Sequence, residues 1–596
     1  MVMRTRKAAR DAGVNFVPQD AVRWFSPTVL ALSGLRVVLA GVMGSYMDKR
    51  ELQQSFPSEC VVRHGREEEL WFDFIADTGD GFDATYSVAW LAGRERLPIA
   101  GSDRELPRAQ LLVLGGDQVY PCAGPSAYED RFTGPFRAAF PLIDDDNEAP
   151  SLVAIPGNHD WYDGLTAFVR LFTQERWIGA WRSVQRRSYA AVQLPHNWWL
   201  WAIDLQKGAE LDEPQKHYFE GIARELMRPD AKVILCVPEP AWVDAAGDPS
   251  AYAALDYLER KLIEPIGARV PLMLSGDSHH YAHYVGDDGS HKVTAGGGGA
   301  FLHPTHDLPG TITLESPTPG GTAPPATSSV TYRLEDRCYP TRRTSRRLAW
   351  GALLLPIRNP SFLMLAAPLH LAFLTTNKVG LTDLAGRSAA DLEERASTLG
   401  FLDLASGLLR SPASMLLMVA VTTLLVAFAK PSAPSSKSRW ERVLLKVVMG
   451  TAHGACQVAA VLGVELLGVN VAGSMASGHG FTASLVVIAA GVGALVGAFV
   501  MGAYLASACA LFGLHGNEAF SSLRLTRHKC FLRLHIGDDG RLTVHPLGVD
   551  QVWHRWRPGG HQPGVPVSGR AMLAPEVQGS DGGPAVHLIE PPYVIA

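Results

Sequence analysis

Short polar motifs containing aspartate or histidine recur through the first half of this 596-residue chain. Four of them read Asp77-Thr-Gly-Asp80, Gly116-Asp117-Gln-Val-Tyr120, Gly157-Asn158-His159-Asp160 and Gly276-Asp277-Ser-His279. Carboxylate oxygens suit hard cations, and borderline metals add imidazole. Two ions about 3.5–4 Å apart need one shared carboxylate and separate flanking ligands. The glycines in these motifs let the chain turn sharply at the ligands. Together, the motifs therefore predict a dinuclear metal centre.

The order and spacing of these motifs resemble the calcineurin-like metallophosphoesterase superfamily, whose pattern is D-x-H or D-x-G, G-D, G-N-H-D/E, an isolated His and G-H-x-H. The D-x-G and G-D-x-x-Y versions are most similar to purple acid phosphatases. The resemblance covers about residues 70–300, and G-N-H-D is its most diagnostic element. It implies hydrolysis of a phosphate ester by metal-bound hydroxide. It also implies two metal ions, with Mn or Fe favoured over Zn or Mg.

Carried over by motif position, the resemblance implies one complete metal site and a catalytic pair. The metal ligands would be Asp77, Asp117, Tyr120 and His279, with Asp117 bridging the two ions. His159, oriented by Asp160, would stabilise the transferring group or protonate the leaving oxygen. A tyrosine after a strand is often a core residue, so that role stays open as the alternative for Tyr120.

The second metal site would use Asp117 and Asn158, and here the chain departs from the family. Glu239 and Asp277 stand where the family has histidines. Both are carboxylates, so the site could still bind metal, with a preference for Mn²⁺ or Mg²⁺ over Zn²⁺. Alternatively the second metal is lost, and Glu239 serves as a cap or an ion-pair partner.

Four more residues are candidates for supporting the ligands: Asp80, Asp204, His280 and His283. Turn and cap roles are the alternatives for the two aspartates. The histidines could stand in for the missing imidazoles. The run Gly296–Gly299 either lets the backbone approach the site or forms an ordinary turn.

Six short apolar runs in residues 1–310 predict the strands that position these motifs. They are Leu70–Ala76, Gln110–Gly115, Ser151–Pro156, Trp198–Ile203, Lys232–Val237 and Pro271–Ser275. Polar residues follow each run, and ligands of open α/β sheets bind at the carboxyl ends of strands. The predicted fold is α/β, and the resemblance implies a layered β-sandwich flanked by helices.

The second half of the chain predicts an all-α transmembrane bundle of about four helices. Charged residues make up only 19% of the chain, below the ~25% usual for soluble domains, and they are scarcest here. The apolar stretches are about Ser361–Thr376, Pro412–Ala429, Val443–Val469 and Thr482–Leu514. The last has no charged residue and exceeds the ~20 residues that span a bilayer.

Lysine and arginine in the flanks predict the orientation. The three basic clusters are Arg342, Arg343, Arg346 and Arg347; Lys430, Lys437, Arg439 and Arg442; and Arg524, Arg527, Lys529 and Arg533. If the chain crosses the membrane four times, all three basic clusters lie on the same side. Since lysine and arginine favour the cytoplasmic side, the catalytic region and both termini are predicted to be cytoplasmic. Thr28–Met47 is interpreted as an amphipathic helix, with a fifth span as the alternative.

The domain boundaries follow from these patterns. They are residues 1–69, an N-terminal helical segment; 70–310, the phosphoesterase domain; 311–345, a linker; 346–515, the transmembrane region; and 516–596, a β-hairpin with a Pro/Gly-rich tail. The hairpin is expected to pack on the catalytic domain. The seven scattered cysteines include no C-x-x-C pair, which favours a reducing compartment.

The partners expected are a phosphate-ester substrate and the lipid bilayer. A net charge of −5 gives no support for a nucleic-acid partner. Two other functions remain open: a catalytically impaired sensor or scaffold that binds a phospho-ligand, and a regulator of a small membrane transporter. The altered second site favours the first, and polar residues within the third span favour the second.

Overall fold

The computed structural model describes residues 2–44, 53, 61–206, 211–317, 327–385, 393–395, 398–431, 439–475, 478–560, 562–576 and 585–596. The chain forms two compact units. The sandwich unit comprises Met1–Val22, Leu32–Arg342 and Leu525–Ala596. The second unit, called the membrane unit because it contains the candidate membrane-crossing helices, comprises Arg23–Ala31 and Arg343–Arg524.

All six predicted strands are present, and they divide between two nine-stranded sheets. The first sheet has the order β21-β18-β17-β2-β5-β6-β8-β7, with β22 also paired to β18. Its parallel centre consists of β2 (Leu70–Ile75), β5 (Leu111–Gly115) and β6 (Ser151–Ile155). Short strands β7 (Trp177–Ile178) and β8 (Trp181–Ser183) complete one edge.

The second sheet has the order β1-β9-β10-β11-β12-β14-β13-β16-β15. Its parallel centre consists of β10 (Trp198–Ala202), β11 (Lys232–Val237), β12 (Arg269–Ser275) and β14 (His291–Ala295). Strands β1 (Val61–Arg63), β9 (Ala190–Gln193) and β13 (Tyr281–Gly286) lie beside them. The carboxyl ends of the central strands in both sheets carry the predicted motifs.

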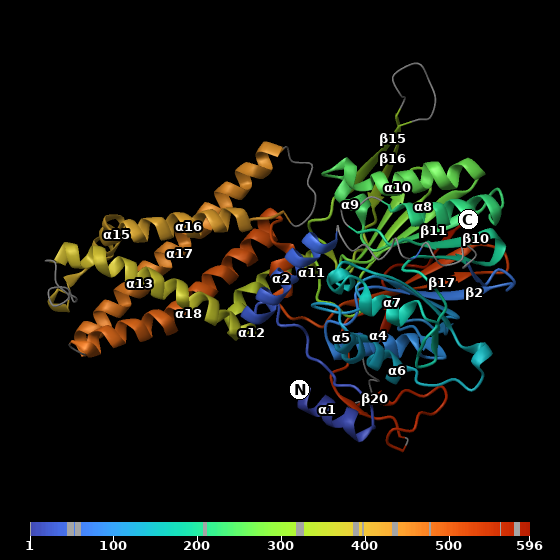
Figure 1. Cartoon of the computed structure of the whole chain (residues 1–596), viewed down its shortest axis with the longest axis horizontal. Helices are drawn as coiled ribbons and strands as arrows, with labels where there is room; N and C mark the ends of the chain where they lie inside the picture. Colours follow the sequence, from blue (N-terminus) through green and yellow to red (C-terminus); the bar gives the residue numbers. More distant parts are fainter. Residues whose placement is uncertain are drawn as a thin grey trace. The chain divides into compact units, whose positions relative to one another are not determined.

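The two sheets pack face to face around a shared apolar core. Alternate residues point into it, as period-2 strands require; Phe72 and Phe74 come from the first sheet, and Trp198 and Leu200 from the second. The outer face of the first sheet packs on α4 (Phe82–Ala92), α6 (Gly134–Ala139) and α7 (Thr166–Phe172). The outer face of the second sheet packs on α8 (Glu213–Glu225), α9 (Ala241–Ala245) and α10 (Ala253–Tyr257). Figure 1 shows these layers. The α/β class and the helix-flanked sandwich are therefore present.

The C-terminal hairpin is part of the first sheet. Strand β17 (Lys529–Ile536) pairs antiparallel with both β18 (Leu542–Val549) and β2. The tail adds β19 (Trp556–Pro558), β20 (Leu573–Pro575), β21 (Val586–Leu588) and β22 (Tyr593–Ile595). Lys529 and Arg533, expected to flank the membrane, are instead fully buried in β17. The hairpin thus completes the sheet that contains Asp77.

The predicted linker is wrong in its first part. Residues Thr311–Pro317 and Thr327–Leu334 form β15 and β16, an antiparallel pair at the edge of the second sheet. Strand β16 also pairs with β13. Proline, glycine, serine and threonine dominate the composition of this stretch. A prediction based on composition therefore assigns a linker where the structure has two strands.

The predicted N-terminal helical segment, residues 1–69, contains α1 (Val2–Asp11) and α2 (Pro27–Gly44), but its residues Val61–Arg63 form β1 of the second sheet. Helix α2 corresponds to the predicted Thr28–Met47, of which residues 45–47 lie outside the described part. Leu30, Leu32 and Leu35 are about half exposed on it. Val22, which precedes this helix, donates its backbone N–H to the buried Asp80 carboxylate at 2.8 Å.

The membrane unit contains, among its described residues, three helices long and apolar enough to cross a bilayer. They are α13 (Leu363–Ala385), α17 (Arg439–Met475) and α18 (His479–Phe512). The predicted span Pro412–Ala429 is α16 (Pro412–Phe428), and α15 (Phe401–Arg410) precedes it at a bend of 94°. A fourth crossing is therefore available if this bent pair counts as one span.

Candidate metal centre

Three predicted ligands leave their strands through the same unusual backbone conformation. Asp77, Asp117 and Asp277 follow β2, β5 and β12, and their φ angles are 59°, 52° and 62°. Few non-glycine residues adopt this left-handed conformation, although aspartate tolerates it better than most. Such backbone strain gathers at functional sites. Its recurrence at three strand ends distinguishes these aspartates from ordinary turn residues.

The hydroxyl of Tyr120 is the point at which the first set of predicted ligands meets. It lies 2.9 Å from Asp77 Oδ1, 3.1 Å from Asp117 Oδ2 and 3.0 Å from His279 Nε2. A phenol has one proton, so it cannot donate to two ionised carboxylates at once. Either one carboxylate is protonated or a cation balances the pair.

Electrostatics at this cluster favour a bound cation. Asp77 and Asp117 are 0% and 2% exposed. Burial, followed by the neighbouring Asp117 and Asp277 carboxylates, raises the pKa of Asp77 well above its ordinary value. Burial, followed by Asp277, raises the pKa of Asp117 to about 8. Within the described residues, Asp77 Oδ2 is buried without a hydrogen-bond partner. The donor set therefore fits a hard divalent cation.

Glycines let the backbone approach both carboxylates closely. A Cβ atom added at Gly157 would lie 2.1 Å from Asp117 Oδ1, and one at Gly296 would lie 2.4 Å from Asp77 Oδ2. Gly298 N–H donates to the Ala76 carbonyl at 2.9 Å. Of the two alternatives for the run Gly296–Gly299, backbone approach to the site is the one observed.

The G-N-H-D loop is tied to this cluster through its backbone. His159 N–H donates to Asp117 Oδ1 at 2.8 Å, and the His159 ring packs on Tyr120 with centroids 4.4 Å apart. His159 Nδ1 lies 2.7 Å from the Pro121 carbonyl. The predicted orientation of this ring by Asp160 is therefore wrong, because the Pro121 carbonyl holds it.

Asp160 instead holds the loop together from inside. Its fully buried carboxylate accepts hydrogen bonds from the backbone N–H groups of Gly157 and Gln118, at 2.9 and 3.3 Å, and from the Tyr128 hydroxyl. Those contacts fix the turn that presents His159. Asp160 is consequently a positioning residue.

The residues predicted for the second metal site lie at the same ends of the strands but are less enclosed. Asp277 is half-buried, and its backbone N–H donates to Asp77 Oδ1 at 3.2 Å. Glu239, also half-buried, follows Pro238, whose carbonyl accepts from Gly276 N–H at 3.2 Å. The Asn158 side chain is exposed. Asp277 is thus adjacent to the first site, whereas ligation by Glu239 and Asn158 stays a prediction.

The four supporting candidates have different surroundings. Asp80 accepts from Val22 and so anchors the N-terminal segment. Asp204 accepts from Ser188 Oγ at 2.6 Å and from Trp161 Nε1 at 3.2 Å, which links it to the G-N-H-D loop. Burial lowers the pKa of His280 to about 3, and that side chain is adjacent to His279 in the sequence.

His283 lies apart from the metal cluster. Its Nδ1 contacts Glu590 Oε1 at 2.8 Å, its Nε2 lies 2.9 Å from His291 Nδ1, and its ring stacks on Tyr593. These partners come from β14 and the C-terminal tail. The suggestion that His283 replaces a missing metal ligand is therefore wrong, because both ring nitrogens are already engaged.

One group near the proposed metal site was missed by sequence reasoning: the Pro121 carbonyl, which no side-chain motif can reveal. His303 follows the glycine run in the sequence, and its ring stacks on His279 with centroids 4.1 Å apart.

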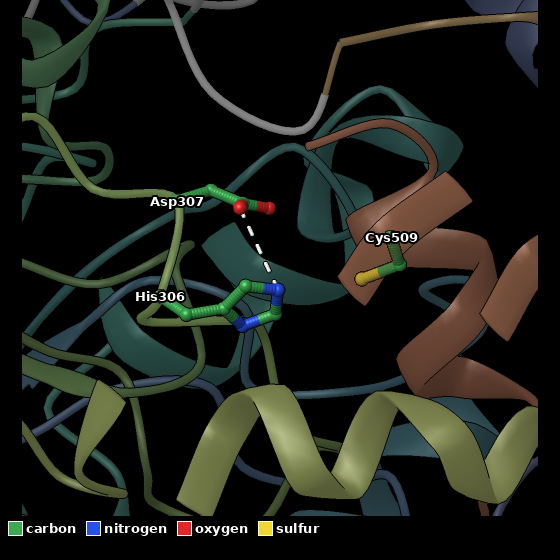
Figure 2. A group of neighbouring side chains, drawn as sticks. All are labelled: His306, Asp307 and Cys509. Carbon is green, nitrogen blue, oxygen red and sulfur yellow. Dashed lines mark ion pairs between the residues drawn. The ribbon is translucent and has the colours of Figure 1, made fainter. Parts of the chain in front are cut away.

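A separate histidine–carboxylate contact is visible in Figure 2, where His306 Nε2 lies 3.5 Å from Asp307 Oδ1. Both residues come from one loop of the sandwich unit, whereas Cys509, also drawn, belongs to the membrane unit. Two neighbouring side chains do not make a metal centre, since structural sites use about four ligands. They form no part of the proposed centre.

No family model and no curated protein matches this chain. The case for function therefore rests on the motifs and on the geometry described above.

Proposed function

We propose that the sandwich unit is a metal-dependent phosphoesterase of the calcineurin-like type, anchored by the membrane unit. The observation that carries this proposal is the convergence of Asp77, Asp117 and His279 on the Tyr120 hydroxyl. These residues come from three strand ends far apart in the sequence. A buried carboxylate oxygen without a hydrogen-bond partner in the described chain lies among them.

The first ion would be held by Asp77, Asp117, Tyr120 and His279, and the second by Asp117, Asn158, Glu239 and Asp277. Metal ions there would supply Lewis acidity and neutralise charge on the phosphoryl group. Because the second set is rich in oxygen, Mn²⁺, Fe or Mg²⁺ fits it better than Zn²⁺.

His159 is the proposed proton-transfer group. Its Nδ1 faces the Pro121 carbonyl, so Nδ1 carries the proton in the neutral ring, and Nε2 is the proposed proton-transfer atom. Burial lowers the pKa of His159, which favours the neutral ring at pH 7. Asp160 and Gly157 hold the loop so that this ring stays against Tyr120.

The proposed topology places the sandwich unit and both termini in the cytoplasm. Strands β2 and β17 are hydrogen-bonded neighbours in one sheet, so the chain returns to the side of the membrane that it left. An even number of crossings is therefore needed between residues 343 and 524. Three long helices and the bent α15–α16 pair supply four.

The same reasoning argues against a fifth span. Val22 before α2 bonds to Asp80, and β1 after it pairs with β9. A single crossing by α2 would separate two segments that belong to one folded unit. Thr28–Met47 is accordingly proposed to lie outside the bilayer or in its surface.

The decisive experiment measures bound metal and the hydrolysis of p-nitrophenyl phosphate and its bis-ester by the purified full chain. Asp117→Asn should lower metal content and reduce turnover at least 100-fold, because the bridging carboxylate loses its charge. Asp230→Asn is a matched control, since Asp230 is exposed and has a similar φ angle of 61°. Equal turnover in the Asp117 and Asp230 variants would refute the proposal.

A non-catalytic phospho-ligand sensor is the second candidate, favoured by the two carboxylates in place of histidines. It predicts binding of inorganic phosphate with at most one metal equivalent and no turnover. Two metal equivalents together with turnover would exclude it.

A further inference from the structure

One acidic side chain is buried deep within the membrane unit. Glu465 lies on α17 inside the candidate span Trp440–Ser474 and is 3% exposed. Its Oε2 accepts a hydrogen bond from Asn377 Nδ2 at 2.5 Å, and Asn377 on α13 is fully buried. Ionisable groups at membrane depth are costly, so their presence marks function more often than packing.

Each member of this pair retains an oxygen without a partner. Within the described part of the chain, neither Glu465 Oε1 nor Asn377 Oδ1 has a hydrogen-bond donor. The helices α13 and α17, which carry the two residues, also contribute to a buried apolar cluster that includes Phe373, Leu381, Leu404, Val461, Leu462 and Val469. A buried acceptor left without a donor destabilises the fold, because it loses the hydrogen bonds that water would supply. A cation at this position would remove that destabilisation and balance the carboxylate.

The broken helix pair packs against the part of α13 that carries Asn377. The helices α15 and α16 meet at Ser411 with a bend of 94°. Ser411 Oγ donates to the Thr376 carbonyl at 2.8 Å, and Ser414 Oγ donates to Thr376 Oγ1 at 2.9 Å. Thr376 directly precedes Asn377, whose Nδ2 also lies 3.5 Å from the Leu404 carbonyl of α15.

Close packing holds this break against α13. A Cβ atom added at Gly380 would lie 2.0 Å from the Gly407 carbonyl, so only glycine permits this approach of the two helices. Irregular backbone within a membrane is tolerated where it is buried in protein, and in transporters such breaks supply carbonyl oxygens to cations. The break between α15 and α16 is therefore a well-packed part of the membrane unit.

We propose that Glu465, Asn377 and the α15–α16 break form a binding site for a small monovalent cation of the Na⁺ type. The oxygens without a partner in the described chain are a carboxylate oxygen and an amide oxygen, which suit hard cations rather than transition metals. One carboxylate balances one positive charge. A proton competes with the cation, because both occupy the same carboxylate.

This inference is independent of the phosphoesterase proposal and concerns the other half of the chain. It would give the membrane unit a role beyond anchoring.

The test uses the full chain in detergent micelles, with ²²Na⁺ binding and thermal unfolding as readouts. Sodium chloride, compared with choline chloride at equal ionic strength, should raise Tm saturably, and about one ²²Na⁺ should bind per chain. Binding should weaken as pH is lowered. Glu465→Gln should reduce ²²Na⁺ binding more than tenfold.

Glu441→Gln is the matched control, because Glu441 is an exposed carboxylate in the first turn of the same helix. It should bind ²²Na⁺ as the unsubstituted chain does. Absence of ²²Na⁺ binding in the unsubstituted chain, or equal binding by Glu465→Gln, would overturn the proposal. If Glu465→Gln does not fold, binding and its pH dependence in the unsubstituted chain decide the matter.

Discussion

At the scale of the residue, negative charge dominates the proposed metal centre. The groups that lower the pKa of Asp77 are the Tyr120 hydroxyl and the Asp277 backbone N–H, and both are uncharged. Three carboxylates therefore lie together at a largely buried position, where mutual repulsion and desolvation act in the same direction. Asp277 is the most informative of the three, because it stands where the resembled family has histidine.

Exchanging that residue should change which metal is preferred. We expect Asp277→His to shift occupancy from Mn²⁺ toward Zn²⁺, because imidazole replaces a hard, charged ligand. Less negative charge should also make bound water more acidic, so the pH profile of turnover should move downward. Metal analysis after dialysis against equal Mn²⁺ and Zn²⁺ measures the shift.

The control for this exchange is Asp230→His, at an exposed turn that shares the left-handed backbone. It should leave the Mn²⁺ to Zn²⁺ ratio unchanged. A ratio that is also unchanged in Asp277→His would remove Asp277 from the ligand set.

A buried histidine outside the proposed metal centre predicts a pH dependence of stability. Burial lowers the pKa of His545 to about 4, below its value of about 6.5 in an unfolded chain. The neutral ring therefore contributes stability that is fully present above pH 6.5 and is lost as pH falls toward 4. His545→Phe retains an aromatic ring against Trp71 and should reduce the loss of Tm between pH 7 and pH 4.5.

The exposed His217 on α8 supplies the comparison. His217→Gln should keep the full pH dependence of Tm. An identical acid loss in His545→Phe and in the unsubstituted chain would show that His545 contributes nothing to it.

At the scale of the element, the strand pair β2–β17 joins the two ends of the sandwich unit. Arg533 on β17 forms a two-pronged ion pair with Asp73 on β2, with distances of 2.7 and 2.8 Å, and both side chains are essentially fully buried. Arg533 Nη1 also donates to the Pro107 carbonyl at 2.8 Å. This contact fixes the register of the strand that ends just before Asp77.

Breaking the pair should be far more harmful than removing a surface arginine. Arg533→Met should lower the free energy of unfolding by about 3–5 kcal/mol, because it leaves the Asp73 carboxylate buried without its partner. Arg541→Met, which removes an exposed arginine near Asp539 on the same hairpin, should cost less than about 1 kcal/mol. Denaturant unfolding of each variant measures the difference.

The double variant Asp73→Asn with Arg533→Met should recover part of the loss, since no unpaired charge then remains. Similar stabilities for Arg533→Met and Arg541→Met would contradict the assigned role of the ion pair.

At the scale of the whole molecule, the sheet constrains the membrane topology. A unit assembled from segments before and after the membrane helices requires both segments on one side of the bilayer. Tags at either terminus should therefore resist protease added outside intact cells, and a tag inserted at Gly478, which directly precedes α18, should be cleaved.

Opposite results at the two termini would mean an odd number of crossings, and would either reopen the fifth span at α2 or contradict the pairing of β2 with β17. Cleavage of both terminal tags from outside would keep the pairing but reverse the proposed orientation.

The amino-acid sequence by itself determined the features that depend on local patterns. Apolar runs predicted the six strands, charge-free length predicted membrane helices, and glycine beside aspartate predicted the sharp turns that hold Asp77 and Asp117. These features can be predicted without tertiary contacts, because strand period, helix length and turn conformation depend on neighbouring residues in the sequence.

The tertiary structure decided what depends on partners distant in the sequence. In the folded chain, Arg533 forms an ion pair with Asp73, and His283 contacts Glu590 instead of serving as a metal ligand. The His159 ring contacts the Pro121 carbonyl. The tertiary structure also turned a supposed linker into β15 and β16. Strand pairing and side-chain partners are set by register and packing between remote segments, and no local pattern encodes them.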